Sequence, residues 1–269
     1  MNETDRKGRL VYFSHGGGPL PILGDPGHAS MVAFMERLPG FLIRPDAVLV
    51  ISAHWEESVP TIIRSDAPEL FYDYYGFPDE AYTLRYQAPG NSRIAGIVES
   101  SLSKSGIDCR QDEGRGLDHG VFIPMKLMYP DAYIPVTQLS LVKGLDPAAH
   151  LALGEALAGL LNENILILGS GFSFHNMRRF AWNAGQEKAD PENDAFQEWL
   201  IGACTGDGTP EERMNTLLEW ETAPSARYCH PREEHLLPLH VCLGAAGGSK
   251  GRVVFDDFIL GKRAVAFLW

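Results

Sequence analysis

The chain has 269 residues, of which 45% are hydrophobic and 22% charged, and a formal net charge of −12. The composition is that of an ordinary globular protein. Its acidic balance, without a run of Lys or Arg longer than a pair, excludes nucleic acid as a favoured partner. No apolar run reaches the ~18 residues of a membrane helix. Four cysteines without a Cys-x-x-Cys pair indicate reduced thiols and a cytoplasmic location.

Short apolar runs bounded by polar, Gly or Pro residues predict strands along the whole chain. In chain order they are 10–13, 47–52, 61–64 at a sheet edge, 134–139, 165–168, 252–255 and 264–268. Helices are predicted between them over 28–38, 91–105, 120–129, 147–161, 191–203 and 232–243, with long loops over 65–90 and 177–190. Because strands alternate with helices, we expect one α/β domain over residues 1–269. Its central sheet, mostly parallel or mixed, should carry helices on both faces.

Three histidines lie just beyond predicted strands. His15 belongs to Ser-His-Gly-Gly-Gly-Pro, His54 to Ser-Ala-His-Trp and His175 to Gly-Ser-Gly-Phe-Ser-Phe-His-Asn. In open α/β sheets, ligands bind beyond the carboxyl ends of the strands. Imidazole is also the commonest protein ligand for transition metals. The pattern therefore predicts one metal-centred site, although a glycine turn or packing at a sheet edge would explain each histidine singly.

Two further histidines lie where helices are predicted to begin. His119 follows Asp118, whose carboxylate could orient the imidazole or simply cap the helix. His235 lies in Arg-Glu-Glu-His-Leu-Leu-Pro-Leu, where Glu233 or Glu234 is an alternative carboxylate ligand. Both histidines are candidates for the same site.

Three other histidines and two glycine motifs are assigned no part in this site. His240 is expected to pack in the interior, whereas His28 and His150 are expected at the surface. His15 with its glycines is similar to an esterase oxyanion loop, but the only Gly-x-Ser-x-Gly, at 247–251, precedes a strand, and no histidine follows His240. A phosphate-binding P-loop is excluded because no Gly-Lys-Ser/Thr follows the glycines at 169–171.

Seven segments, taken together and in their order along the chain, resemble the LigB-like extradiol ring-cleavage dioxygenases, and most closely their DOPA 4,5-dioxygenase branch. The resemblance extends from about residue 11 to 245, and six conspicuous pieces are Ser-His-Gly-Gly-Gly-Pro, Ile-Ser-Ala-His-Trp, Tyr-Asp-Tyr-Tyr-Gly-Phe-Pro, Gly-Leu-Asp-His-Gly, Gly-Ser-Gly-x-x-x-His-Asn and Glu-His-Leu-Leu-Pro-Leu. The seventh, which lies between the fourth and fifth of these, is Met-Tyr-Pro-Asp-Ala-Tyr-Ile-Pro-Val-Thr-Gln-Leu-Ser, and Tyr-Gln-Ala-Pro-Gly accompanies the third. Each motif is weak alone, but their common order is a strong signal.

The resemblance implies roles for particular residues. His15, His54 and His235 would bind one non-haem Fe(II) per chain, with Zn(II) as an alternative occupant. His235 stands where the wider superfamily often has a glutamate, so the site departs from the two-His-one-carboxylate triad. His175 would be the acid/base catalyst, and in some zinc-bound relatives it is a fourth ligand. His119 would contact the substrate.

The resulting functional hypothesis is O₂-dependent opening of a catechol ring in a monomer or small homo-oligomer. His175 would take a phenolic proton and return one as the ring opens. Two alternatives stay open: a zinc-dependent hydrolase, because three histidines and water also describe a catalytic zinc site, and a metal-binding or interaction protein without turnover. The aromatic segment 71–86 is a candidate wall of the substrate pocket.

Overall fold

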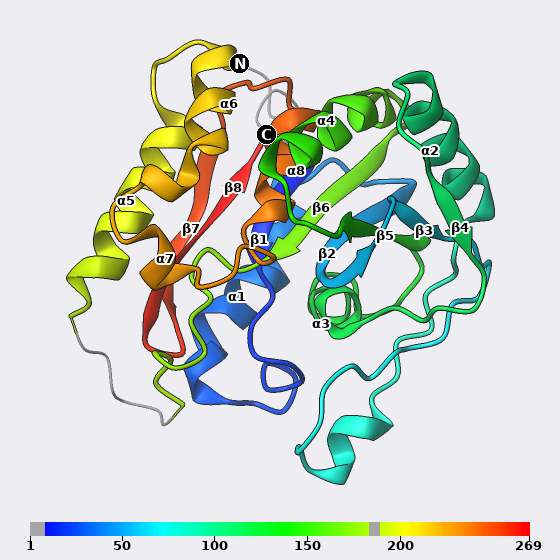
Figure 1. Ribbon diagram of the computed structural model, residues 1–269. Helices are drawn as coiled ribbons and strands as arrows, with labels where there is room; N and C mark the ends of the chain where they lie inside the picture. Colours follow the sequence, from blue (N-terminus) through cyan, green and yellow to red (C-terminus); the bar gives the residue numbers. More distant parts are fainter. Residues whose placement is uncertain (1–8, 183–188) are drawn as a thin grey trace.

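The computed structural model describes residues 9–182 and 189–269. Its strands form a single eight-stranded sheet in the order β4-β3-β5-β2-β6-β1-β8-β7 (Figure 1). The four strands β5, β2, β6 and β1 are parallel, and β3 and β8 join this centre antiparallel. The bounds are β1 (Leu10–Ser14), β2 (Ala47–Glu57), β3 (Thr61–Ile63), β4 (Arg110–Asp112), β5 (Val136–Val142), β6 (Ile165–Gly171), β7 (Arg252–Ile259) and β8 (Lys262–Leu268). The expected mixed sheet is confirmed.

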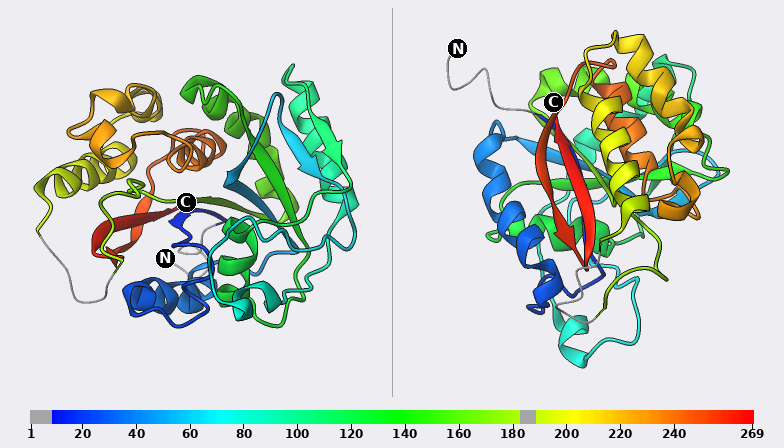
Figure 2. Two further views of the ribbon diagram at one scale, coloured as in Figure 1. Left: turned by 60° about the horizontal axis from the view of Figure 1, so that its bottom comes forward. Right: turned by 90° about the vertical axis from the view of Figure 1, so that its left-hand side faces the viewer.

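Helices cover both faces of the sheet because its central strands are buried on both sides. On one face α1 (Ala29–Arg37) and α3 (His119–Met128) pack together, and on the other α2 (Ser92–Lys104), α4 (Pro147–Leu157), α5 (Pro191–Thr205) and α8 (Leu237–Ala245) cover the strands. The right-hand view of Figure 2 shows β7 and β8 lengthwise, with α1 on one side of them and α5 on the other. The shorter α6 (Pro210–Leu218) and α7 (Ala226–Cys229) complete the second layer.

Helix α8 lies close to its neighbours because glycines allow the backbones to approach. A Cβ atom on Gly154 of α4 would lie 2.1 Å from the carbonyl oxygen of Val241, and one on Gly244 would lie 2.2 Å from that of Leu151. Such contacts are possible only where a side chain is absent. They pack α8 directly against α4, and α8 also contacts β6.

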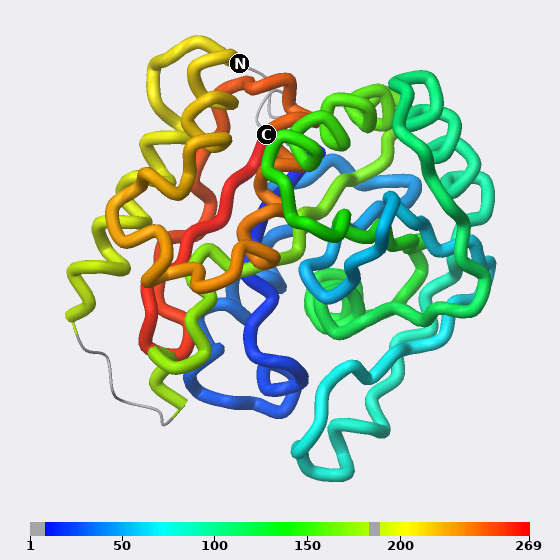
Figure 3. Tube along the Cα trace, in the orientation of Figure 1, coloured from blue at the N-terminus to red at the C-terminus, as the bar shows by residue number. Residues whose placement is uncertain are grey.

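Several element boundaries differ from the sequence-based expectation. Strand β2 extends to Glu57 instead of ending at 52, and β4, α6 and α7 were not predicted. The predicted helix 232–243 begins only at Leu237, with Pro238 in its first turn. The loop 65–90 contains a short 3₁₀ helix, Asp79–Thr83, and extends away from the sheet as the cyan segment of Figure 3.

The second predicted loop, 177–190, falls partly outside the described residues. In the described part of the chain, no helix combines the length and the apolar character that crossing a membrane requires.

Candidate active site

His15 directly follows β1, and its ring is held in one tautomer. Its backbone N–H donates to the carbonyl of Gly171 on the neighbouring strand β6 (3.1 Å), and its Nδ1 lies 2.9 Å from Oγ of Ser170. The Ser170 hydroxyl donates its one hydrogen to the carbonyl of Gly120, so it must accept from Nδ1–H of His15. Nε2 of His15 therefore carries no hydrogen, and its lone pair is free to bind a metal in the pocket.

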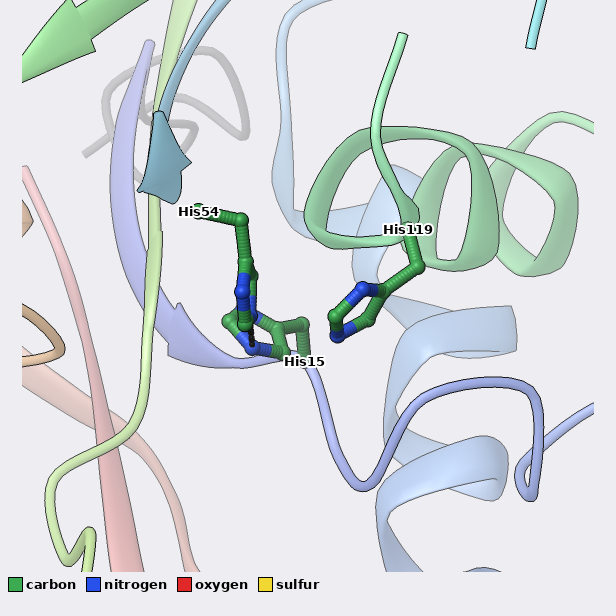
Figure 4. Close-up of side chains that lie close together, drawn as sticks. All are labelled: His15, His54 and His119. Carbon is green, nitrogen blue, oxygen red and sulfur yellow. Dashed lines mark hydrogen bonds between the residues drawn. The ribbon is translucent and has the colours of Figure 1, made fainter. Parts of the chain in front are cut away.

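His54 lies within β2, where the pairing with β5 changes register between Ile51 and Glu56. Such irregularities redirect side chains and are frequent beside active sites. Its Nε2 atom lies 2.9 Å from Nε2 of His15, and the close-up in Figure 4 shows the two rings meeting beyond the strand ends. The predicted convergence of His15 and His54 is found in the structure, although His54 lies inside β2 and not beyond its end.

His235 reaches the same point from the segment before α8. Its Nε2 atom lies 3.3 Å from Nε2 of His54, while its Nδ1 donates to Oε1 of Glu234 (2.8 Å). Its carbonyl accepts hydrogen bonds from the Phe172 N–H and the Tyr12 hydroxyl, both 3.0 Å long. These bonds to the sheet explain why the chain is not yet helical at this residue.

His119 opens α3 and is oriented by a carboxylate that the sequence did not reveal. Both its backbone N–H (3.0 Å) and its Nδ1 (2.8 Å) donate to Oδ1 of Asp73. The other oxygen of Asp73 lies 3.7 Å from Nδ1 of His54. The ring of His119 is 4.0 Å from that of His54, centroid to centroid, and projects into the site in Figure 4.

Asp118 does not have either of the roles expected for it. Its side chain makes no capping bond to α3 and instead accepts hydrogen bonds from Ser52 (2.8 Å), Arg115 (3.3 Å) and Gln138. It is fully buried and ties β2 and β5 to the start of α3. The carboxylate that orients His119 comes from Asp73, 46 residues earlier in the chain.

His175 lies against His235 on the other side of the site. The two rings stack with centroids 3.3 Å apart and planes 18° apart. Nδ1 of His175 lies 3.0 Å from Oε1 of Glu234, the same oxygen that accepts from His235. Glu234 thus bridges His175 and His235, as Asp73 bridges His119 and His54.

The local electrostatics favour neutral imidazoles and ionised carboxylates. Burial, with some help from neighbouring imidazoles, puts the pKa values of His15, His54 and His235 well below the ordinary 6.5. Burial alone would raise the pKa of Asp73 and Glu234, but hydrogen bonds from His119 and His175 hold both below the ordinary carboxyl value. Neutral imidazole is the form that coordinates metals.

The donor set fits a transition metal. Atoms bound to one zinc at 2.0–2.1 Å in tetrahedral geometry lie about 3.3 Å apart, close to the 2.9 and 3.3 Å between the Nε2 atoms. Because Nδ1 of His15 and of His235 donates to protein oxygens, their Nε2 lone pairs face His54. Nε2 of His54 carries at most one hydrogen and can donate to only one of the two, whereas a cation between the three atoms would accept all three lone pairs.

The five histidines lie at the base of a pocket of about 340 Å³. Its upper walls come from the aromatic segment after β3 and from the loop after β6. The side chains of these walls include Tyr74, Tyr75, Phe77, Phe180 and Trp182, and Leu260 joins them from the turn between β7 and β8. Three aromatic residues of the segment 71–86 therefore line the pocket, whereas its Phe71, Tyr72, Tyr82 and Tyr86 do not.

The expectation that His28 and His150 lie at the surface is wrong, since both are fully buried. His28 donates to Asp25 (2.8 Å) and accepts from the N–H of Gly17 (2.9 Å), which fixes the glycine loop after His15. His150 bonds to the carbonyl of Asp146 (2.7 Å) and the N–H of Val142 (3.1 Å). His240 is buried in the interior, as expected.

Comparison with known proteins agrees with this geometry. Residues 26–260 match the family of the catalytic LigB subunit of aromatic ring-opening dioxygenase. The chain is 40% identical to the dioxygenase tasH of Hapsidospora irregularis, over 97% of this chain and 85% of the relative. It is 38% identical to the 4,5-DOPA dioxygenase extradiol of Beta vulgaris, over 96% and 94%.

The fold is also found in a solved structure. A crystal structure of an uncharacterized protein from Escherichia coli K12 superposes with a TM-score of 0.76 and 27% identity, covering 96% of this chain and 99% of the other. The E. coli 4,5-DOPA dioxygenase extradiol is 31% identical over 89% of this chain and 86% of the relative. The chain therefore belongs to the LigB family of aromatic ring-opening dioxygenases, and it is an extradiol ring-cleavage dioxygenase acting on small aromatic molecules with O₂.

Proposed function

We propose that the protein opens the ring of a catechol beside its two hydroxyl groups, with one non-haem Fe(II) per chain. His15, His54 and His235 are the proposed ligands. The observation that carries the proposal is the meeting of their three Nε2 atoms at the base of the pocket. Neutral nitrogen donors suit iron and zinc alike, so Zn(II) is an alternative occupant.

When bound, the metal would orient the catechol and O₂ and couple them electronically. Three neutral imidazoles leave the full double charge on such a cation. The carboxylates of Asp73 and Glu234 stand one imidazole away from it, so they increase the basicity of His54 and His235 without becoming ligands. The remaining positive charge favours binding of the catechol as an anion.

His175 is the proposed acid/base catalyst. Because its Nδ1 faces Glu234 at 3.0 Å, its Nε2 is the nitrogen available to take a phenolic proton from the bound catechol. The carboxylate then stabilises the imidazolium until the proton is returned as the ring opens. A positioned acid/base of this kind contributes roughly 10²–10⁴-fold to the rate.

His119 is the proposed contact to the substrate on the opposite side of the site. Asp73 accepts from its Nδ1, which leaves Nε2 as a hydrogen-bond acceptor toward a substrate hydroxyl. Its ring lies 5.3 Å from that of His15, centroid to centroid, and 4.0 Å from that of His54. His119 and His175 would therefore hold the ring plane of the catechol between them.

The test is anaerobic reconstitution with Fe(II), followed by O₂ uptake and absorbance measurements against several catechols. We expect one O₂ consumed per catechol and a yellow ring-opened product. The zinc-loaded protein is the control and should consume no O₂. A zinc-dependent hydrolase would instead act without O₂, and a protein that binds metal without turnover would leave every catechol unchanged.

A cytoplasmic location and a monomer or small homo-oligomer are further parts of the proposal. All four cysteines are unpaired, which is typical of a reducing compartment. Size-exclusion chromatography with light scattering would determine the oligomeric state.

A further inference from the structure

Above the histidines, the pocket is an aromatic slot. Tyr74 and Phe77 pack edge to face on one side, with centroids 5.5 Å apart. On the other side Phe180 packs against Trp182 at 5.5 Å and against Phe172 at 5.2 Å. A flat substituent that extends from the bound ring would pass between these two walls.

The glycines after His15 form the floor on which both walls rest. A Cβ atom on Gly17 would lie 3.4 Å from the indole of Trp182, and one on Gly18 would lie 3.4 Å from the ring of Phe77. Each wall thus lies directly against the glycine backbone. The walls are therefore held beside the histidines and define the path of any group attached to the substrate ring.

No cationic side chain of the described residues lines the slot. Asp73 and Glu234 lie behind the imidazoles, and none of the described residues that line the pocket is Lys or Arg. Among the cations on nearby segments, Arg115 binds Asp118 and Arg232 binds Glu56. Arg179 lies over the ring of Tyr228, and Arg178 is exposed and does not line the pocket.

Among the described residues, a carboxylate on the substrate would find no cationic partner in this slot. Its desolvation against aromatic rings is costly unless a cation or several N–H groups replace the lost water. The catechol bound as an anion, together with the carboxylates of Asp73 and Glu234 behind the imidazoles, offsets the double charge of the metal, so the metal offers little further attraction to a carboxylate on the substituent. An apolar or aromatic substituent, by contrast, gains from burial against the same rings.

We propose that the preferred substrate is a catechol whose ring substituent is uncharged and apolar or aromatic, not one that carries a carboxylate. The proposal rests on the proposed catechol-cleaving function and specifies its substrate class. An amino-acid side chain such as that of DOPA, which appears in the names of several relatives, would place its carboxylate in the unpartnered part of the slot.

The test compares 3-(3,4-dihydroxyphenyl)propanoic acid with its methyl ester, in which the charge is removed and one methyl group is added. Binding to the zinc-loaded protein is measured anaerobically by calorimetry, which needs no turnover. We expect the ester to bind at least about tenfold more tightly, a difference of ~1.4 kcal/mol. Equal binding, or tighter binding of the acid, would overturn the proposal.

A variant tests the electrostatic reason. Met177 lines the pocket and is 53% exposed, so Met177→Arg adds a cation at the mouth of the slot and should tighten binding of the acid about tenfold or more relative to the ester. Met177→Gln, of similar length and without charge, is the matched control and should keep the ratio of the wild-type protein within about threefold. An unchanged ratio in Met177→Arg contradicts the proposal.

Turnover separates this proposal from the one on which it rests. In the iron-loaded protein, kcat/KM should follow the same order, ester above acid. If both compounds are cleaved and the acid is preferred, the substrate class is wrong and ring cleavage stands. If the zinc form prefers the ester but the iron form consumes no O₂ with either compound, catechol cleavage is wrong and the preference of the slot stands.

Discussion

The nine histidines fall into two groups that differ in how their second ring nitrogen is used. In the pocket, Nδ1 of each imidazole faces a protein oxygen, and Nε2 is directed toward the other imidazoles or the cavity. Outside the pocket, Nε2 instead bonds to the protein backbone. The histidines of this second group are His28, His150, His230 and His240.

Burial does not distinguish these groups. Removal from water lowers the pKa of His15 in the pocket and, in the same direction, that of His240 in the interior, to about 4. Both are neutral at pH 7, so a buried neutral histidine is not in itself a sign of a metal site. The distinguishing feature is a carboxylate or hydroxyl on Nδ1 together with an Nε2 that has no backbone partner.

The largest effect should come from comparing one substitution in the pocket group of histidines with one in the group outside the pocket. His54→Ala removes a proposed ligand, so we expect metal content and O₂ uptake to fall by at least about a hundredfold. His150→Gln should keep a full complement of metal but lose roughly 1–3 kcal/mol of unfolding free energy, because buried backbone groups lose their partners. Metal analysis beside urea unfolding measures both. Metal loss in His150→Gln alone would contradict the distinction.

The next largest effect separates ligands from the acid/base catalyst within the pocket. His175→Ala should retain much of the iron and yet cleave catechols about 10²–10⁴-fold more slowly. His235→Ala, which removes the ring stacked on it, should lose iron and activity together. Iron content and single-turnover rates distinguish the two, and wild-type cleavage by His175→Ala would show that its assigned role is wrong.

A smaller effect should follow from neutralising the bridging carboxylates. Glu234→Gln weakens the bond that orients His235 and His175, so the affinity for zinc should fall about 10–100-fold. Glu233→Gln is the neighbouring control, because Glu233 pairs with Arg227 and not with a histidine of the pocket. Zinc titration against a competing chelator measures the affinity, and equal loss in both variants would refute the bridging role.

The smallest effect concerns the stability of the protein in acid and tests the role of His240, one of the histidines outside the pocket. Burial lowers the pKa of His240 to about 4, below the 6.5 of the unfolded chain. Between these values the unfolded state binds the extra proton, so unfolding free energy should decrease by up to about 1.4 kcal/mol per pH unit as the pH falls.

His240→Gln provides the comparison for this acid effect. The variant is less stable at pH 7 but should lose less unfolding free energy than the wild-type protein between pH 6.5 and 4.5. Urea unfolding of both proteins in the presence of a chelator removes any contribution of metal binding. Parallel losses in the two proteins would show that His240 does not titrate in this way.

The sequence was sufficient to predict that His15, His54 and His175 converge, because parallel strands deliver their carboxyl ends to one edge of a sheet. His235 lies before a helix and was a candidate through its histidine-rich segment and the resemblance. The sequence was insufficient for Asp73, which lies in the long loop 65–90 without any periodic pattern and meets His119 only in the folded chain. Asp118, beside His119 in sequence, was the more obvious partner, but it bonds to the sheet instead.

Local sequence patterns also led to wrong predictions for the positions of two histidines and for the start of one helix. His28 and His150 begin amphipathic segments, yet both turn inward to bond backbone groups of the sheet and of the glycine loop. The helix predicted over 232–243 starts late because the carbonyl of His235 accepts from Phe172 and Tyr12 on the sheet. Each of these outcomes depends on a partner far away in the sequence.

Gly171 has a consequence for how this enzyme could be altered. A Cβ atom there would lie 2.1 Å from the carbonyl oxygen of His235, so even alanine would push a proposed ligand out of place. Saturation libraries should therefore leave the end of β6 untouched and concentrate on rim positions such as Tyr75, which is 92% exposed. Selectivity can evolve at the rim while the chemistry beneath it is inherited unchanged.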